Sequence, residues 1–285
     1  MRTPPQPADD PRNVLRALGL RPRRSLSQSF LTDPARLERI AAAAIPGPGW
    51  TAIEIGPGTG ALTAALARRA DRVVAVEADR ALAEATAAAF SDRPHVHIEA
   101  GDARDFDFTG PGLPRPLAVA GNIPYHLTGL LIRRVLDAEP PPDRVVLMVQ
   151  AEVAERLVAS PGGRDYGALT VLVGAGWSMR RLFKVPRGAF HPPPKVDSAV
   201  VSFEPLAPPR CPPELRERFR RVVLAAFSHR RQVLRNALRH GGFSADALSR
   251  FAALPGVRLD HRPEEHEVEA FVSLAAASRD TDQTT

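Results

Sequence analysis

The chain has 285 residues, 44% of them hydrophobic and 25% charged, which is ordinary for a globular protein with one large and one small domain. No apolar stretch is long enough to span a membrane, no secretory signal precedes the first helix, and Cys211 is the only cysteine, so we expect a cytoplasmic protein without disulfides or a metal site. The net charge of +6 is compatible with a polyanionic partner, although enrichment in arginine, alanine and proline also fits a GC-rich genome.

The N-terminal region reads as an extension over residues 1–20. Residues 1–11 are polar and rich in proline, which predicts disorder. A short helix is expected next, with Val14, Leu15 and Leu18 on one side and Gly19 ending it.

From residue 33 onward, expected helices alternate with short apolar runs. The helices are predicted over residues 35–44, 61–70, 81–90, 129–136 and 151–158. The strands are predicted over residues 51–55, 73–76, 96–99, 117–120 and 144–149. Continuous apolar strands separated by helices are typical of a mostly parallel sheet with helices on both faces. Two further strands, 169–173 and 198–203, are expected to pair antiparallel at one edge.

A change of pattern marks the C-terminal part. Five prolines between residues 205 and 213 indicate a stiff linker. After it, helices without strands are expected over residues 214–240, 244–253 and 264–277. The sequence therefore predicts an α/β domain over residues 21–205 and a small all-α domain over residues 206–285.

A glycine-rich turn follows the first of the parallel strands. Gly56, Gly58 and Gly60 lie between this strand and a helix, and Glu77 ends the next strand. Glycines let the backbone approach a ligand closely, and an acid at that second strand end can accept both hydroxyls of a ribose. The pattern also fits a dinucleotide fingerprint, through Gly56, Gly58 and Ala61, or a tight turn without a ligand.

Asp102 follows the third strand, where a carboxylate can accept from an adenine amine or simply cap a turn. Together, Gly56, Gly58, Gly60, Glu77 and Asp102 resemble the cofactor site of Rossmann-like S-adenosylmethionine methyltransferases. The resemblance implies S-adenosylmethionine as the methyl donor and no metal. It assigns the ribose to Glu77 and the adenine to Asp102.

The fourth strand ends in Asn122-Ile123-Pro124-Tyr125, which is similar to the N-[IL]-P-[FY] signature of adenine-N6 methyltransferases. The simpler interpretation is a helix start with Asn as cap and Pro at the first position. For the chemistry, the Asn122 side-chain carbonyl and the Pro124 backbone carbonyl can each accept one N6 hydrogen, which localises the nitrogen lone pair. The Tyr125 ring can stack on the base, and no general base is required.

Other motifs extend the resemblance. Gln28-Ser29-Phe30-Leu31 looks like the Gln-Asn-Phe-Leu motif that lines the cofactor pocket, and it implies cofactor contacts from Gln28, Ser29 and Leu31. Ser29 departs from the family Asn, which puts one of these contacts in doubt. Residues 190–200 match as well, and there the aromatic at the Phe190 position stacks on the flipped adenine opposite the tyrosine.

Two families share these features, and the helical region favours one of them. Residues 227–238 are similar to the F-x-x-R-R-K-x-L-R-x-x-L motif of the small-subunit rRNA adenine-N6 dimethyltransferase family, with Gln232 in place of Lys. The resemblance implies dimethylation of two adjacent adenosines in the 3′-terminal hairpin of 16S rRNA, in ribosome biogenesis. The alternative is the family that methylates 23S rRNA and confers macrolide resistance.

Basic residues are the expected RNA contacts, with an immature small ribosomal subunit as partner and the protein a monomer. They are Arg23, Arg24, Lys195, Arg230, Arg231 and Arg235. On one helix, a spacing of four would place Arg231 and Arg235 on the same face. Such a face either contacts phosphates without reading sequence or is simply solvated.

Two functions of other classes remain open. A nicotinamide oxidoreductase would satisfy the glycine pattern but leaves Asn122 to Tyr125 unexplained. A non-catalytic RNA-binding or assembly factor could use the same fold. The intact Asn122, Pro124 and Tyr125 argue against that second alternative.

Overall fold

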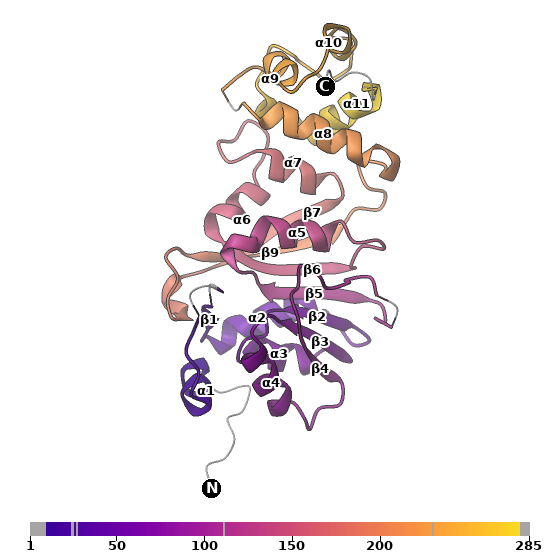
Figure 1. The fold of residues 1–285 in the computed structure, drawn as a ribbon. Helices are drawn as coiled ribbons and strands as arrows, with labels where there is room; N and C mark the ends of the chain where they lie inside the picture. Colours follow the sequence, from indigo (N-terminus) through magenta and orange to yellow (C-terminus); the bar gives the residue numbers. More distant parts are fainter. Residues whose placement is uncertain (1–9, 24–25, 27, 111, 230, 280–285) are drawn as a thin grey trace. The chain divides into compact units, whose positions relative to one another are not determined.

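The computed structural model describes residues 10–23, 26, 28–110, 112–229 and 231–279 (Figure 1). Contacts divide the chain into two compact units, the first made of the residues up to 154 together with 180–204, the second of 155–179 together with the residues from 205 on. The second unit thus includes residues 155–179 in addition to the C-terminal segment that the sequence suggested.

A seven-stranded sheet forms the centre of the first unit, in the order β4-β3-β2-β5-β6-β9-β7 (Figure 1). Its strands are β2 (Thr51–Ile55), β3 (Arg72–Glu77), β4 (Val96–Ala100), β5 (Leu117–Asn122), β6 (Arg144–Gln150), β7 (Trp177–Val185) and β9 (Ser198–Pro205). Strands β2 to β6 run parallel, and β9 pairs antiparallel with β6. The predicted mostly parallel sheet is confirmed.

The strands in the middle of the sheet are buried because most of their side chains are apolar on both faces. All five residues of β2 are buried, as are the central residues of β5 and β6. Helices lie between or beside these strands: α2 (Pro34–Ala44), α3 (Ala61–Ala67), α4 (Arg80–Ala89), α5 (Thr128–Leu136) and α6 (Ala151–Leu157). Side-chain caps begin two of them, because Asp33 accepts from the Arg36 amide and Asp79 from the Ala81 amide.

The strand order reverses between β2 and β5, and this reversal positions the site. Strand β2 has β3 on one side and β5 on the other, so loops leaving β2 and β5 diverge at their carboxyl ends. Ile55 is the register partner of Gly121, which brings Gly56 and Asn122 to the same edge of the sheet. Gly121 itself is tightly packed, since a Cβ there would lie 2.6 Å from the Ile55 carbonyl oxygen.

The N-terminal segment joins this edge through a second, two-stranded sheet. Helix α1 (Pro11–Leu18) ends at Gly19, whose φ is 67°, as the sequence predicts. Strand β1 (Phe30–Leu31) then pairs antiparallel with β8 (Phe190–His191). The Thr32 amide and hydroxyl both donate to the Ala189 carbonyl, at 2.8 and 2.9 Å.

The described part of the second unit is helical apart from the beginning of β7. Its helices are α7 (Ala168–Gly174), α8 (Arg216–Phe227), α9 (Leu234–His240), α10 (Ala245–Ala252) and α11 (Val268–Ala277). Phe219, Phe251 and Phe271 are buried in its core, as are Leu234 and Leu238.

One predicted strand is wrong. Residues 169–173, expected to form a strand, lie in helix α7, where Thr170, Val171 and Val173 are buried. A run of five apolar residues fits either a strand or a buried helix, and in the folded chain its packing favours the helix. The expected edge strand is instead β7, whose exposed charged residues hide the strand pattern.

The helix expected over residues 214–240 is interrupted between α8 and α9. At the end of α8 the Ser228 hydroxyl donates back to the Ala225 carbonyl, and Val233 is extended. The Leu234 amide then donates to the His261 carbonyl at 2.7 Å. The polar run between Phe227 and Val233 offers no apolar side chain to bury, so a continuous helix gains nothing there.

Candidate functional site

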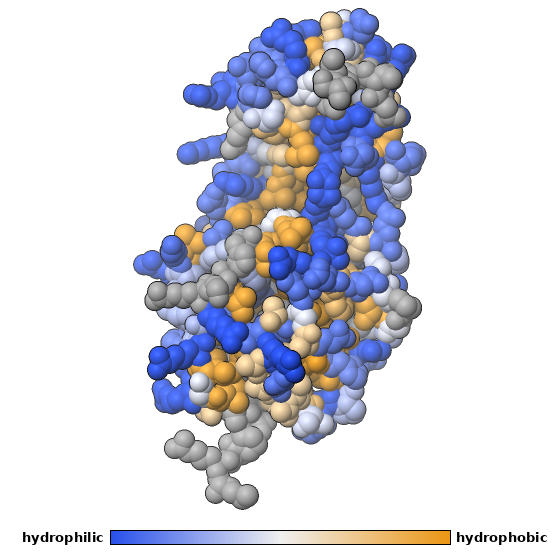
Figure 2. Space-filling model, viewed as in Figure 1, coloured by the Kyte–Doolittle hydropathy of each residue, from blue (hydrophilic) through white to orange (hydrophobic). Residues whose placement is uncertain are grey.

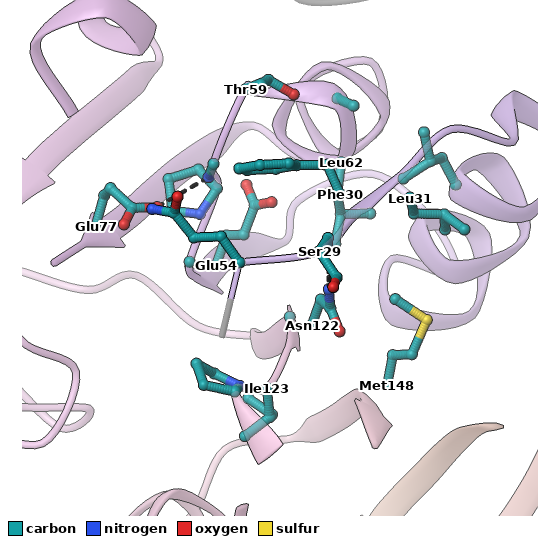
Figure 3. A pocket seen from close by; sticks show the side chains of 18 of the residues that line it. Ser29, Phe30, Leu31, Glu54, Thr59, Leu62, Glu77, Asn122, Ile123 and Met148 are labelled. Atoms are coloured by element: carbon teal, nitrogen blue, oxygen red, sulfur yellow. Dashed lines mark hydrogen bonds between the residues drawn. The ribbon is translucent and has the colours of Figure 1, made fainter. Parts of the chain in front are cut away.

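A pocket opens where the carboxyl ends of β2 and β5 meet (Figure 3). Three stretches of chain and several single residues line it: the segment before α2, the glycine turn, and the turn after β5. The predicted site residues that line it are Gln28, Ser29, Leu31, Gly56, Gly58, Glu77, Asn122, Pro124 and Tyr125. The structure therefore brings together residues that are almost 100 positions apart in the sequence.

The glycine turn has the backbone that its sequence requires. Gly56, Gly58 and Gly60 all have positive φ, at 70°, 56° and 83°. A Cβ on Gly58 would lie 2.7 Å from the Phe30 ring, so the absence of a side chain is what lets the two approach. Gly60 shapes the turn but is not among the residues that line the pocket.

Glu77 is buried and held in place by the backbone. Its two carboxylate oxygens accept from the Gly58 amide and the Asp79 amide, each at 2.9 Å. Burial raises the pKa of Glu77, and these two hydrogen bonds oppose the effect. Each oxygen keeps a further lone pair, so the carboxylate can still accept from a ligand in the pocket.

Gln28 links the N-terminal segment to the turn after β3. Its Nε2 donates to Asp79 Oδ2 at 3.1 Å, and its Oε1 accepts from the Arg23 amide at 2.7 Å. The Arg23 guanidinium lies 3.4 Å from the same Asp79 oxygen. Arg23, expected to contact RNA, therefore forms an ion pair beside the cofactor-type pocket, while Gln28 both lines the pocket and secures its wall.

Asp102 is not among the lining residues. Its Oδ1 accepts from the Arg104 amide at 2.8 Å, and its Oδ2 accepts twice from the Arg104 guanidinium, at 2.9 and 2.7 Å. These contacts lower the pKa of Asp102. A ligand amine that used Asp102 would have to share it with Arg104.

Asn122 is oriented by the N-terminal segment. Its Nδ2 donates to the Ser29 carbonyl at 2.9 Å, so Oδ1 is the amide atom left to accept from a ligand (Figure 3). The contact uses the Ser29 backbone, which means that the replacement of Asn by Ser at this position leaves it intact. The Pro124 carbonyl accepts from the Leu127 amide at 2.9 Å and from the Thr128 hydroxyl at 3.3 Å, and that hydroxyl also donates to the Tyr125 carbonyl at 3.1 Å.

The two aromatic residues proposed for the base lie in different surroundings. Tyr125 is half-buried, lines the pocket, and places its hydroxyl 3.0 Å from Ser198 Oγ. Phe190 is 5% exposed on β8, where it pairs with Leu31, and it is not among the lining residues.

Glu54 is a pocket residue that the sequence reasoning missed. It lies on β2, is 1% exposed, and faces the cavity between Phe30 and Asn122 (Figure 3). Burial raises the pKa of Glu54 to about 8, with a further contribution from Glu77, while Thr63 acts in the opposite direction. Among the described residues its Oε2 has no hydrogen-bond partner. An acid inside an otherwise apolar strand was the available signal.

The basic residues expected to bind RNA are only partly described. Lys195, Arg231 and Arg235 are exposed, whereas Arg24 and Arg230 lie outside the described residues. Arg231 precedes α9 in a turn, so the expected shared helix face with Arg235 is wrong. Figure 2 shows hydrophilic residues over much of one face, with apolar residues between them.

The described residues contain neither a candidate metal site nor a candidate membrane span. No group of three or more His, Cys, Asp or Glu there is placed to hold a metal ion. In the same part of the chain, no helix has the length and apolar character needed to cross a membrane.

The family profile and the relatives that match this chain all have names of ribosomal RNA methyltransferases. The sequence profile of the family described as Ribosomal RNA adenine dimethylase matches residues 19–276. A Ribosomal RNA small subunit methyltransferase A of Geobacter sulfurreducens is 42% identical over 266 residues, covering 91% of this chain and 96% of that protein. A protein of the same name from Moorella thermoacetica is 40% identical over 271 residues, covering 92% of this chain and 94% of its own.

Two solved structures are similar over most of the chain. A dimethyladenosine transferase from Plasmodium falciparum has a TM-score of 0.72 at 23% identity, covering 86% of this chain and 95% of that one, and it is a likeness of fold alone. The 23S rRNA methyltransferase ErmE has a TM-score of 0.64 at 28% identity, covering 87% of this chain and 98% of its own.

Proposed function

The chain belongs to the ribosomal RNA adenine dimethylase family, and from that premise we propose that it dimethylates N6 of two adjacent adenosines in the 3′-terminal hairpin of 16S rRNA during ribosome biogenesis. It is a methyltransferase with a Rossmann-like fold. The observation that carries the proposal is one cavity that holds both the glycine and acid cradle and the Asn122-to-Tyr125 turn.

The pocket residues fit S-adenosylmethionine, which supplies a methyl group activated on a sulfonium. Glu77 has lone pairs for the hydroxyls of a ribose, and Gly58 leaves the space that a Cβ would fill. Glu54 also lines this cavity, and its buried Oε2 has no hydrogen-bond partner among the described residues. A positive charge bound nearby would favour the ionised form of this carboxyl. Asp102 and Phe190 remain proposed contacts of the cofactor and the base.

The turn after β5 would prepare the target nitrogen. The Asn122 Oδ1 would accept one N6 hydrogen and the Pro124 carbonyl the other, with the Thr128 hydroxyl then donating only to the Tyr125 carbonyl, which holds the amine in one orientation. The Tyr125 ring would stack on the base and fix its plane. Because the chain aligns the nucleophile and needs no ionised base, positioning accounts for the rate enhancement.

The RNA partner is proposed to be an immature small subunit. Lys195, Arg231 and Arg235 are exposed cations suited to contact phosphates. We place the reaction in the cytoplasm, with the protein acting as a monomer. Relatives that are about 40% identical carry a small-subunit name, which favours this RNA over 23S rRNA.

Transfer of a tritiated methyl group to ribosomal subunits lacking these modifications tests the proposal. We expect label in the small subunit, recovered as dimethyladenosine after digestion to nucleosides. Asn122→Ala should abolish transfer while leaving subunit binding intact, and it serves as the control for contaminating activity. Label in the large subunit alone would contradict the proposed substrate, and binding without any transfer would point to an assembly factor.

A further inference from the structure

The Tyr125 hydroxyl lies beside Ser198, a residue that has no role in the reaction proposed above. Ile123, two residues earlier, donates its amide to the Met148 carbonyl, so the pairing of β5 with β6 continues up to the start of this turn. Beyond β6, Tyr125 places its hydroxyl 3.0 Å from Ser198 Oγ. The ring is thus held at one end by its own backbone and at the other by strand β9.

Ser198 is a fixed point of the fold. It is fully buried, with an exposed fraction of 0%, and it pairs in register with Gln150 of β6. The neighbouring Asp197 is tied down as well, because its carbonyl accepts from the Ala151 amide and its Oδ1 from the Arg187 amide, both at 2.9 Å. The hydroxyl of Ser198 therefore moves little relative to the sheet.

We propose that Ser198 is a positioning residue, whose hydroxyl holds the Tyr125 ring in one position so that the target adenine stacks in one place. This inference rests on the proposed function. A tyrosine ring half-exposed at a pocket can swing about its Cα–Cβ bond, which moves the hydroxyl by several times an ordinary bond length, and a hydrogen bond from that hydroxyl to an immobile group opposes the swing. Small misalignments of a reacting nitrogen lower transfer rates strongly.

A buried hydroxyl at this place needs a partner, and the choice of partner is informative. Leaving a buried polar group unpaired is costly, yet Ser198 pairs with a side chain at the pocket rather than with backbone. Ser202, on the same strand and 5% exposed, shows the ordinary alternative, because its hydroxyl donates to the Arg180 carbonyl at 3.4 Å.

The kinetic test compares Ser198→Ala, Tyr125→Phe and the double variant under single-turnover conditions with unmodified small subunits. Loss of one hydrogen bond predicts a transfer rate about three- to tenfold lower for each single variant, with the half-saturating subunit concentration unchanged. If Ser198 acts through Tyr125, the double variant is no slower than the slower single variant. Ser202→Ala is the matched control and should transfer methyl groups at the wild-type rate.

A spectroscopic readout separates positioning from a purely structural role. The chain has only two tyrosines, Tyr125 and Tyr166, so selective ring labelling gives two signals in a carbon-13 NMR spectrum. Tyr166 bonds to the His266 carbonyl through its own hydroxyl. We expect Ser198→Ala to shift or broaden the Tyr125 signal and leave the Tyr166 signal in place, without any cofactor or RNA present.

The outcomes are distinct. A Ser198→Ala variant with wild-type transfer, an unmoved Tyr125 signal, or additive losses in the double variant would each overturn the inference. If Ser198→Ala does not fold, Tyr125→Phe removes the same hydrogen bond from the pocket side, and an unchanged rate there overturns it as well. A wild-type protein without transfer activity would refute the proposed function, whereas the NMR result would still decide the role of Ser198 in orienting the ring.

Discussion

Replacing Glu54 by Gln should remove much of the loss of stability that this protein suffers between pH 6 and pH 8. Glu54 lies on β2 with 1% of its surface exposed, next to the carboxylate of Glu77. Gln has almost the same shape and carries no charge at any of these pH values. The comparison therefore isolates the cost of ionising this one buried carboxyl.

The direction and size follow from the difference between the two states. Burial raises the pKa of Glu54 to about 8 in the folded chain, against 4.5 when unfolded. Between these values the folded state keeps a proton that the unfolded state releases, so the free energy of unfolding falls as pH rises. At about 1.4 kcal/mol per pH unit, levelling off near the folded pKa, the loss between pH 6 and pH 8 is about 2 kcal/mol.

Urea unfolding at pH 6, 7 and 8 measures the effect. The advantage of the Glu54→Gln variant over the wild type in free energy of unfolding should grow by about 2 kcal/mol from pH 6 to pH 8, because over this range Glu54 is ionised in the unfolded chain and gives up its proton only gradually in the folded one. Glu84→Gln is the control, since Glu84 is exposed on α4 and pairs with Arg80 at 2.8 Å, and its curve should run parallel to that of the wild type. Parallel curves for Glu54→Gln and the wild type would refute the reasoning.

Three further substitutions test other parts of the structure. Gly121→Ala puts a Cβ 2.6 Å from the Ile55 carbonyl oxygen, and urea unfolding should show a loss of about 2 kcal/mol or more; an unchanged midpoint would mean that β2 and β5 separate easily. Gly58 has a φ of 56°, and a Cβ added there by Gly58→Ala would also clash with the Phe30 ring. Calorimetry should therefore show at least about tenfold weaker S-adenosylmethionine binding, and an unaltered affinity would argue against this turn as the cofactor cradle. Arg235→Ala should weaken small-subunit binding and lower the salt dependence by about one unit without changing cofactor affinity; an unchanged salt slope would mean that Arg235 is only solvated.

Local sequence patterns predicted much of the fold, because residues close together in the sequence determine where many of these helices and strands begin and end. The run of residues 51–55 is apolar enough to be buried on both faces, and the glycines after it must adopt positive φ. The same holds for α1, which ends at Gly19. Where an element depends on distant contacts, the prediction failed: β1 and β8 have two residues each, too few for any periodicity.

The residues of the site also divide into those that local motifs predicted and those that they did not. Motifs brought Gly56, Glu77 and Asn122 to one pocket, because their spacing follows the strands of a parallel sheet. Glu54 and Ser198 were given no role from the sequence, since only the partners of a polar residue across the sheet reveal its environment. Nor does the sequence distinguish an Asp102 that faces a ligand from one held by Arg104 two residues later.

The pairing of β1 with β8 also bears on when this pocket can first exist. Thr32 and Ala189, which join beside that pairing, are 157 positions apart in the chain. Contacts of such long range form late in folding, after the loop between them has closed. A nascent chain that has not yet emerged past residue 191 lacks this support for one wall of the cavity, however much of the sheet it has assembled. The proposed S-adenosylmethionine pocket would thus be complete only after residue 191 has emerged and β1 has paired with β8.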